Sequence, residues 1–164
     1  YKAVVRRVPA DGGPAAITGL LREHGVGSLV LPGGVDASWR QAVSEAGVAV
    51  REDDPPLSHQ ELNRTDAVLT ASTVSIAETG TIVLDHSPDQ GRRALSLVPD
   101  VHLCVVRADQ VVSDVPEAVA RLAESVQQGR PLTWISGGSA TSDIELNRVE
   151  GVHGPRTLLV ILAE

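Results

Sequence analysis

Residues 28–50 read SLVLPGGVDASWRQAVSEAGVAV and decide the predicted fold class. The apolar run at residues 28–31 predicts a short strand, which a turn-forming Pro-Gly-Gly then ends. Apolar side chains at helical spacing follow over about residues 37–46, and residues 48–50 predict a second strand. Strand, helix and strand in this order are typical of a parallel sheet covered by helices.

The same alternation extends in both directions along the chain. We expect helices within residues 11–25 and 116–127, and strands at residues 101–106, 132–135 and 157–162. Residues 67–84 break the pattern, because two β-rich runs there are separated around Glu78-Thr79-Gly80, which predicts a hairpin. The sequence therefore predicts the α/β class, as a single domain over residues 1–164 with an open sheet and helices on both faces.

Composition indicates one globular core and narrows the possible chemistry. The chain has 164 residues, and 42% of them are hydrophobic without any Phe or Met, so Val, Leu, Ile and Ala must form the core. A net charge of -7 argues against nucleic acid as a partner, although local amides can still bind a small anion. Lys2 is the only lysine, which leaves almost no candidate for a phosphate-binding or Schiff-base lysine.

The single cysteine, Cys104, limits cofactor binding. One chain can form neither an internal disulfide nor a Cys-ligated zinc or iron–sulfur site, so we expect a cytoplasmic protein that encodes no cofactor site of its own. No apolar run approaches the ~20 residues of a membrane span. The chain starts at Tyr1 and contains no Met, so we expect the natural protein to extend further at its N-terminus.

The strongest candidate site is the Gly/Ser/Thr-rich loop that follows the strand at residues 132–135. Glycines let backbone amides approach a ligand, hydroxyls donate hydrogen bonds, and the start of a following helix adds partial positive charge. Such a loop suits an anion, and it follows the C-terminal end of a strand, where open α/β sheets place ligands. The alternative is that Ser142 or Asp143 only caps the next helix. The residues assigned to the ligand are Ser136, Gly137, Gly138, Ser139, Ala140, Thr141, Asp143 and Glu145.

Two shorter segments supply candidate acid–base and anion-binding groups. The segment His153, Gly154, Pro155 and Arg156 is a rigid turn that presents an imidazole and a guanidinium. In the predicted hairpin turn, a partly buried Glu78 could act as base or nucleophile beside Thr79, Gly80 and Thr81. Each segment has a structural alternative, namely a tight turn whose His bonds a backbone carbonyl, and a Glu bonded to amides of its turn.

The other histidines are expected to lie at the surface or in packing contacts, because their spacing matches no metal-ligand pattern. These residues are His24, His59, His86 and His102. Cys104 lies within an apolar strand and is expected to be a small core residue.

At these segments the chain resembles the LUD domain family. The matching stretches are residues 76–83, 97–102, 136–145 and 151–156, in an order and spacing that agree with the family from about Asp66 to the end. The first 60 residues match only in pattern. The resemblance implies an open α/β sheet like that of the sugar-phosphate isomerase and CoA-transferase superfamily, with a ligand cleft at strand ends. Gly138 stands where family members often have Pro, so we expect a more flexible loop here.

The resemblance also implies a function in oxidising L-lactate to pyruvate, alongside partner subunits that carry iron–sulfur clusters. The first hypothesis is a non-redox accessory protein that binds a small anionic ligand in a cleft formed by the three segments. The second is an enzyme acting on a phosphorylated sugar or a CoA thioester, with Glu78 as base or nucleophile and His153 as acid. The third is a scaffold whose turns serve only folding and partner docking.

Overall fold

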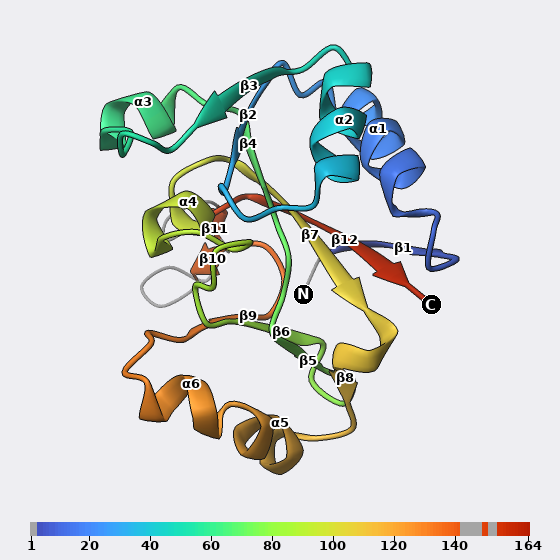
Figure 1. Ribbon diagram of the computed structural model, residues 1–164, viewed down its shortest axis with the longest axis vertical. Helices are drawn as coiled ribbons and strands as arrows, with labels where there is room; N and C mark the ends of the chain where they lie inside the picture. The colour runs from blue at the N-terminus through green and yellow to red at the C-terminus, as the bar shows by residue number, and fades with distance from the viewer. Residues whose placement is uncertain (1–2, 142–148, 151–153) are drawn as a thin grey trace.

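A six-stranded parallel sheet forms the centre of the protein (Figure 1). The computed structural model describes residues 3–141, 149–150 and 154–164. Neighbours in the sheet follow the order β1, β12, β7, β4, β2 and β3, and every pair is parallel. The strands are β1 (Val4–Val8), β2 (Ser28–Leu31), β3 (Ala49–Glu52), β4 (Ala67–Thr70), β7 (Val101–Arg107) and β12 (Thr157–Ala163).

Helices cover both faces of this sheet. One face packs against α1 (Gly13–Glu23) and α2 (Ala37–Glu45), through a core that includes Leu20 and Val43. On the opposite face, Leu62 of α3 (His59–Asn63) and Leu95 of α4 (Arg93–Leu97) pack against Val68 of the sheet. The predicted α/β class with helices on both faces is therefore confirmed.

A smaller sheet of four strands completes the layer on that opposite face (Figure 1). The predicted hairpin forms its centre, with β5 (Val74–Ile76) antiparallel to β6 (Thr81–Leu84), and Gly80 in the turn has a φ of +62° that glycine adopts without strain. β8 (Val111–Val112) pairs with β5, and β9 (Thr133–Ile135) pairs with β6. The two sheets pack through Ile82 and Leu84 against Cys104, so Cys104 is the core residue that the sequence predicts.

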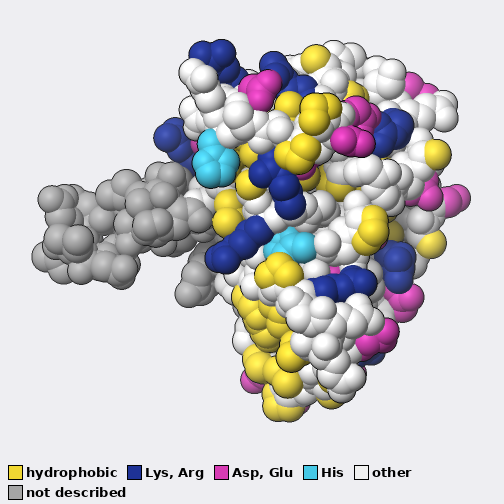
Figure 2. All heavy atoms as spheres, turned by 60° about the vertical axis from the view of Figure 1, so that its left-hand side comes forward, with side chains coloured by type: hydrophobic (Ala, Val, Ile, Leu, Met, Phe, Trp, Pro, Cys, Tyr) yellow, Lys and Arg dark blue, Asp and Glu magenta, His cyan; other side chains and the backbone are white. Residues whose placement is uncertain are grey.

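Two short helices cover the outer face of the four-stranded sheet. The helix expected over residues 116–127 is divided at Leu122 into α5 (Val115–Arg121) and α6 (Ala123–Gln127). Figure 2 shows hydrophobic side chains gathered at this end of the molecule, where Val119 and Val126 of these helices are exposed. The remaining elements are the 3-10 helix η1 (Ala108–Gln110) and the paired strands β10 (Ala140–Thr141) and β11 (Val149–Glu150). Over the described ranges, no helix has the length and apolar character needed to cross a bilayer.

Candidate functional site

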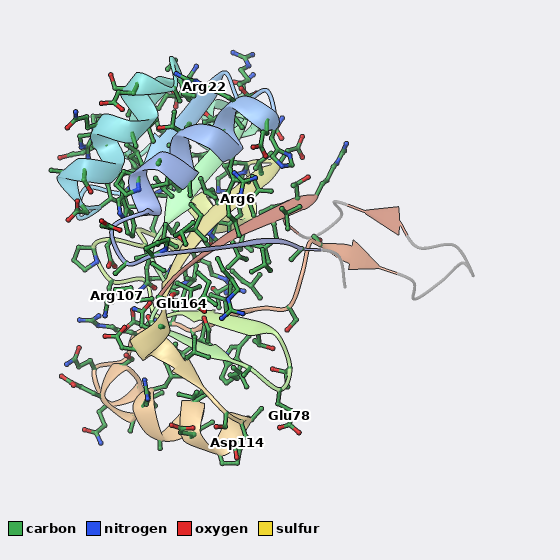
Figure 3. All side chains as sticks on the ribbon, turned by 90° about the vertical axis from the view of Figure 1, so that its right-hand side faces the viewer. Arg6, Arg22, Glu78, Arg107, Asp114 and Glu164 are labelled. Carbon is green, nitrogen blue, oxygen red and sulfur yellow. The ribbon has the colours of Figure 1, made fainter. Side chains whose placement is uncertain are left out.

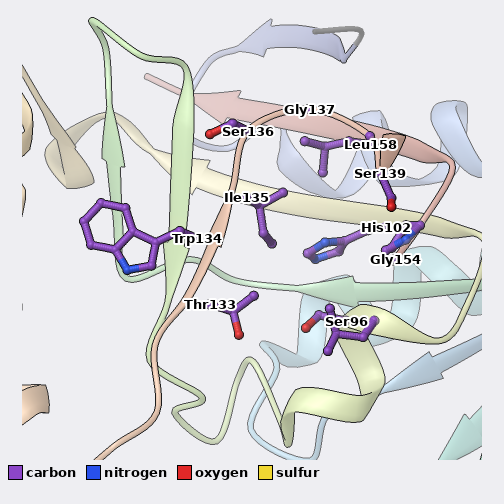
Figure 4. A pocket seen from close by; sticks show the side chains of 13 residues that line it. Ser96, His102, Thr133, Trp134, Ile135, Ser136, Gly137, Ser139, Gly154 and Leu158 are labelled. Carbon is purple, nitrogen blue, oxygen red and sulfur yellow. The ribbon is translucent and has the colours of Figure 1, made fainter. Parts of the chain in front are cut away.

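A cavity of about 250 Å³ lies where the six-stranded sheet faces β9 and the loop that follows it (Figure 4). His102 of β7 and Leu158 of β12 line it from the large sheet, and residues 133–135 of β9 line it from the small sheet. The predicted loop supplies four further lining residues, which are Ser136, Gly137, Gly138 and Ser139. Gly154 also lines the cavity, so the structure brings together parts of two segments that lie far apart in the sequence.

Close backbone contacts join the loop to the segment at residues 155–156. The amide of Ser139 donates a hydrogen bond of 2.7 Å to the carbonyl oxygen of Pro155. A Cβ atom added to Gly138 would lie only 2.5 Å from the carbonyl oxygen of Arg156. Gly138 therefore lets two backbone segments approach each other, while the expected flexibility of the loop stays a prediction.

We predict that Gly138→Ala lowers the free energy of unfolding by about 1–3 kcal/mol, because the backbone at Arg156 must move to admit the methyl group. Thermal unfolding of the variant checks this, as a lower Tm. Gly33→Ala is the matched control, since a Cβ at Gly33 meets open space. Equal Tm values for Gly138→Ala and the parent protein would show that the loop is not fixed at this contact.

A chain of three hydroxyls connects the hairpin to the loop. The Thr79 hydroxyl donates to Thr81 Oγ1 at 2.7 Å, and Thr81 Oγ1 lies 2.7 Å from Ser136 Oγ. Because a hydroxyl oxygen can accept two hydrogen bonds, either hydroxyl of the Thr81–Ser136 pair can be the donor. The pair ties Ser136, which lines the cavity, to the hairpin. Thr79 and Thr81 thus orient Ser136 and do not line the cavity themselves.

His102 contributes an uncharged imidazole to the cavity wall. Only 1% of its surface is exposed, and burial lowers its pKa to about 4, so the ring is neutral at physiological pH. Its Nε2 atom lies 2.8 Å from Thr70 Oγ1. The sequence predicts only a surface or packing role for His102, and its place within the matching stretch 97–102 is the one signal that points to more.

Several predicted residues lie away from this cavity or outside the described residues. Glu78 is exposed at the tip of the hairpin, where Figure 3 shows it pointing away from the protein, and it does not line the cavity. Arg156 is also exposed and forms an ion pair of 3.6 Å with Asp100. Gly80 forms the hairpin turn. Ala140 and Thr141 belong to β10, and the predictions for Asp143, Glu145 and His153 fall outside the described residues.

The loop follows a strand of the small sheet and not, as the sequence predicts, a strand of the large parallel one. β9 is antiparallel to β6 in the small sheet, so the rule that places ligands at the C-terminal ends of parallel strands does not apply to the loop after it. The C-terminal edge of the large sheet holds a different, wider cavity of about 840 Å³, lined by Trp39, Asp89 and Arg107 among others. None of the predicted ligand residues that the structure describes lines that second cavity.

Comparisons with known proteins give a consistent family assignment. The LUD domain matches residues 38–163. A protein named lactate utilization protein C from Deinococcus radiodurans is 57% identical over 162 residues, covering 99% of this chain and 74% of the relative. A protein of the same name from Bacillus pumilus is 32% identical over 180 residues, covering all of this chain and 73% of the relative.

A solved structure has a similar fold. The crystal structure of a DUF162 family protein from Deinococcus radiodurans superposes with a TM-score of 0.83 at 49% identity, over 99% of this chain and 88% of that chain. The family resemblance inferred from the sequence motifs is thereby confirmed. The chain belongs to the LUD domain family.

Proposed function

We propose that this protein is an accessory component of L-lactate utilization that binds a small carboxylate in the cavity between the two sheets. The name shared by its relatives supports the pathway. The polar lining of the cavity supports the ligand, because Ser136 and the other hydroxyl residues of that lining can donate hydrogen bonds to a carboxylate. This lining of uncharged donors is the observation on which the proposed binding function rests.

The size and polarity of the cavity favour a small acid over a large cofactor. Its volume of about 250 Å³ lies below the roughly 300–1,000 Å³ typical of drug-sized ligands. Its polar lining consists of neutral groups, which include Ser96, Thr133, Ser136 and Ser139. The Thr133 hydroxyl is engaged with His86 Nε2 at 2.8 Å, and the Ser96 hydroxyl donates to a carbonyl oxygen of its own helix. Ser136, in the predicted loop, is the lining hydroxyl whose contribution to binding a variant can test.

Electron transfer in this proposal belongs to partner subunits with iron–sulfur clusters. Cys104 is the only cysteine of the sequence and is fully buried between the sheets, where burial raises its pKa to about 12. A single buried thiol of this kind is a poor ligand for a cluster. The protein would hold or deliver the acid, and the partners would carry the electrons.

Calorimetric titration of the protein with L-lactate tests the proposal. We expect saturable binding of L-lactate or pyruvate, and no binding of neutral lactamide. Ser136→Ala should weaken binding roughly 10-fold, because it removes a hydrogen bond to a charged group. Ser44→Ala, at an exposed position of α2, is the matched control and should leave the affinity unchanged. Failure of the parent protein to bind either acid would refute the proposal.

The alternative enzymatic function depends on Glu78 and is separated by a second variant. We expect Glu78→Gln to leave the affinity for L-lactate within about twofold, because the side chain is exposed and lies outside the cavity lining. An isomerase or CoA-transferase activity of the parent protein that Glu78→Gln abolishes, with the fold intact, would favour the enzyme instead.

A further inference from the structure

A separate groove, beside the loop that joins β6 to α4, gathers basic side chains in an acidic protein. This arginine groove has a volume of about 540 Å³ and is lined by Arg92, Arg93 and Arg130. Figure 2 shows basic side chains gathered around a histidine on one face of the molecule. Because the whole chain carries a net charge of -7, such a local concentration of positive charge calls for an explanation.

The three arginines differ in how many of their donors the fold already uses. Arg92 is held by the carboxylate of Asp53, which lies 2.7 Å from its Nε and 2.9 Å from its Nη2. Within the part of the chain that the structure describes, Arg130 donates through Nη1 only, most closely to Ser87 Oγ at 2.7 Å. Arg93 is exposed and forms no hydrogen bond or ion pair with any other described residue. Arg93 and Arg130 therefore keep guanidinium donors for a ligand.

The carboxylate of Asp85 does not cancel this positive charge on the open side of the groove. Among the described lining residues, Asp85 is the only one with a carboxylate. It is 4% exposed, and its oxygens accept hydrogen bonds from three hydroxyls and from Arg130 Nη1 at 3.3 Å. Since donors of the protein already occupy these oxygens, the solvent-facing charge of the groove is positive.

The wall of the groove is fixed in an uncommon backbone conformation. His86 lines the groove with a φ of +59°, in the left-handed region that residues with a Cβ atom seldom adopt. Its ring fixes this conformation, because Nδ1 donates to the carbonyl oxygen of Gly91 at 2.9 Å and Nε2 lies 2.8 Å from Thr133 Oγ1. With both nitrogens engaged, His86 shapes the groove and leaves the ligand to the arginines. Strained backbone of this kind is concentrated at ligand-binding and switch regions.

We propose that the arginine groove is a further binding site, which takes the phosphate group of a small phosphate ester. Such a group carries about two negative charges at neutral pH and has three acceptor oxygens, which suit the planar donor pairs of guanidinium groups. Two arginines act together, because one exposed ion pair contributes little. The groove has more room than phosphate needs, and Pro88 and Pro131 line it beside the carbon skeleton of the ester. This site does not depend on the proposed carboxylate cavity.

Titration of the protein with inorganic phosphate and with glycerol 3-phosphate, at pH 7.5 and constant ionic strength, tests the proposal. We expect saturable binding of both anions, with the ester at least as tight as phosphate, and no binding of glycerol. In nitrogen-15 NMR spectra, amide signals of groove residues such as Gly91 and Arg93 should move along the same saturation curve. Absence of saturable binding, or signals that move only elsewhere, would overturn the site. Weaker binding of the ester than of phosphate would overturn the ligand class.

Two substitutions show whether these arginines hold the anion. Arg93→Gln and Arg130→Gln should each weaken the binding of phosphate roughly 5- to 10-fold. Arg22→Gln is the matched control, because it removes the same charge from an exposed position of α1, which covers the other face of the large sheet. Arg93 has no partner among the described residues, so its variant keeps the fold even if the loss of Arg130 from Asp85 disturbs it. An unchanged affinity in Arg93→Gln would contradict the proposal, and so would an equal loss in Arg22→Gln.

Discussion

Acidification from pH 8 to pH 4 is expected to remove about 3 kcal/mol of the free energy of unfolding through His102 alone. The ring titrates near pH 6.5 in the unfolded chain and near pH 4 in the folded protein, because burial disfavours its charged form. Between these values the unfolded state binds the additional proton, so protons favour unfolding. The stability is fully present above pH 6.5 and falls as the pH decreases towards 4.

Urea unfolding at several pH values between 8 and 4 measures this effect. His102→Gln should remove most of the pH dependence in this window, since an amide does not titrate. His24→Gln is the control, because His24 is exposed at the end of α1 and its loss should leave the slope unchanged. Parallel pH profiles for His102→Gln and the parent protein would show that His102 is not buried as a neutral ring.

Asp85→Asn is expected to destabilise the protein by about 3 kcal/mol at neutral pH. Asp85 is 4% exposed, and its carboxylate accepts hydrogen bonds from the hydroxyls of Thr73 at 2.9 Å, Ser87 at 2.5 Å and Ser125 at 2.7 Å. Although burial opposes ionisation, these hydrogen bonds together hold its pKa at about 2. The side-chain NH2 group of Asn is itself a donor, so it would face hydroxyl groups that also donate. Some of these buried hydroxyls would then have no acceptor.

The pH window of this second effect differs from that of His102. The folded pKa of Asp85 lies below the unfolded value of 3.8, so its contribution is present above about pH 4 and is lost as the pH falls towards 2. Thermal unfolding of Asp85→Asn at pH 7 should show a lower Tm. Asp109→Asn is the matched control, because Asp109 forms an exposed ion pair with Arg107 that contributes little. A Tm equal to that of the parent would contradict the proposed role of Asp85.

The hydrogen-bonded group formed by Asp85 with Thr73, Ser87 and Ser125 also positions the cavity. It fixes the start of the loop at residues 85–91, and His86 in that loop reaches Thr133 of β9 with Nε2 and the carbonyl oxygen of Gly91 with Nδ1. Thr133 begins the strand that leads into the Ser136 loop. We therefore expect changes at Asp85 to disturb ligand binding as well as stability.

The α/β fold class could be predicted because local signals and tertiary structure agree in the segments that form the large sheet. The strands at residues 28–31 and 101–106 and the helix within residues 11–25 match the structure closely. The second sheet could not be predicted, because hydrophobic runs indicate strands but do not determine which sheet each strand joins. β5 and β6 carry the same apolar signal as β4, yet they lie in a different layer.

The loop of the candidate site could be predicted from the sequence, whereas the residues of the cavity wall could not. Glycines and hydroxyls at residues 136–139 are a local signal, and these residues do line the cavity. The place of His102 in the wall depends on the pairing of β7 with β4, which brings Thr70 within 2.8 Å of its ring from 32 residues away in the sequence. Such a contact has no local signature. Glu78 illustrates the reverse case, in which the local pattern does not reveal that the side chain is exposed.

The most direct test of carboxylate binding between the two sheets is a crystal structure of the protein with L-lactate. We expect the acid in the cavity of about 250 Å³, with a carboxylate oxygen about 2.7–3.0 Å from a hydroxyl of the lining such as Ser136 Oγ. Lactate bound instead at the C-terminal edge of the large sheet, in the cavity beside Trp39 and Arg107, would contradict this assignment.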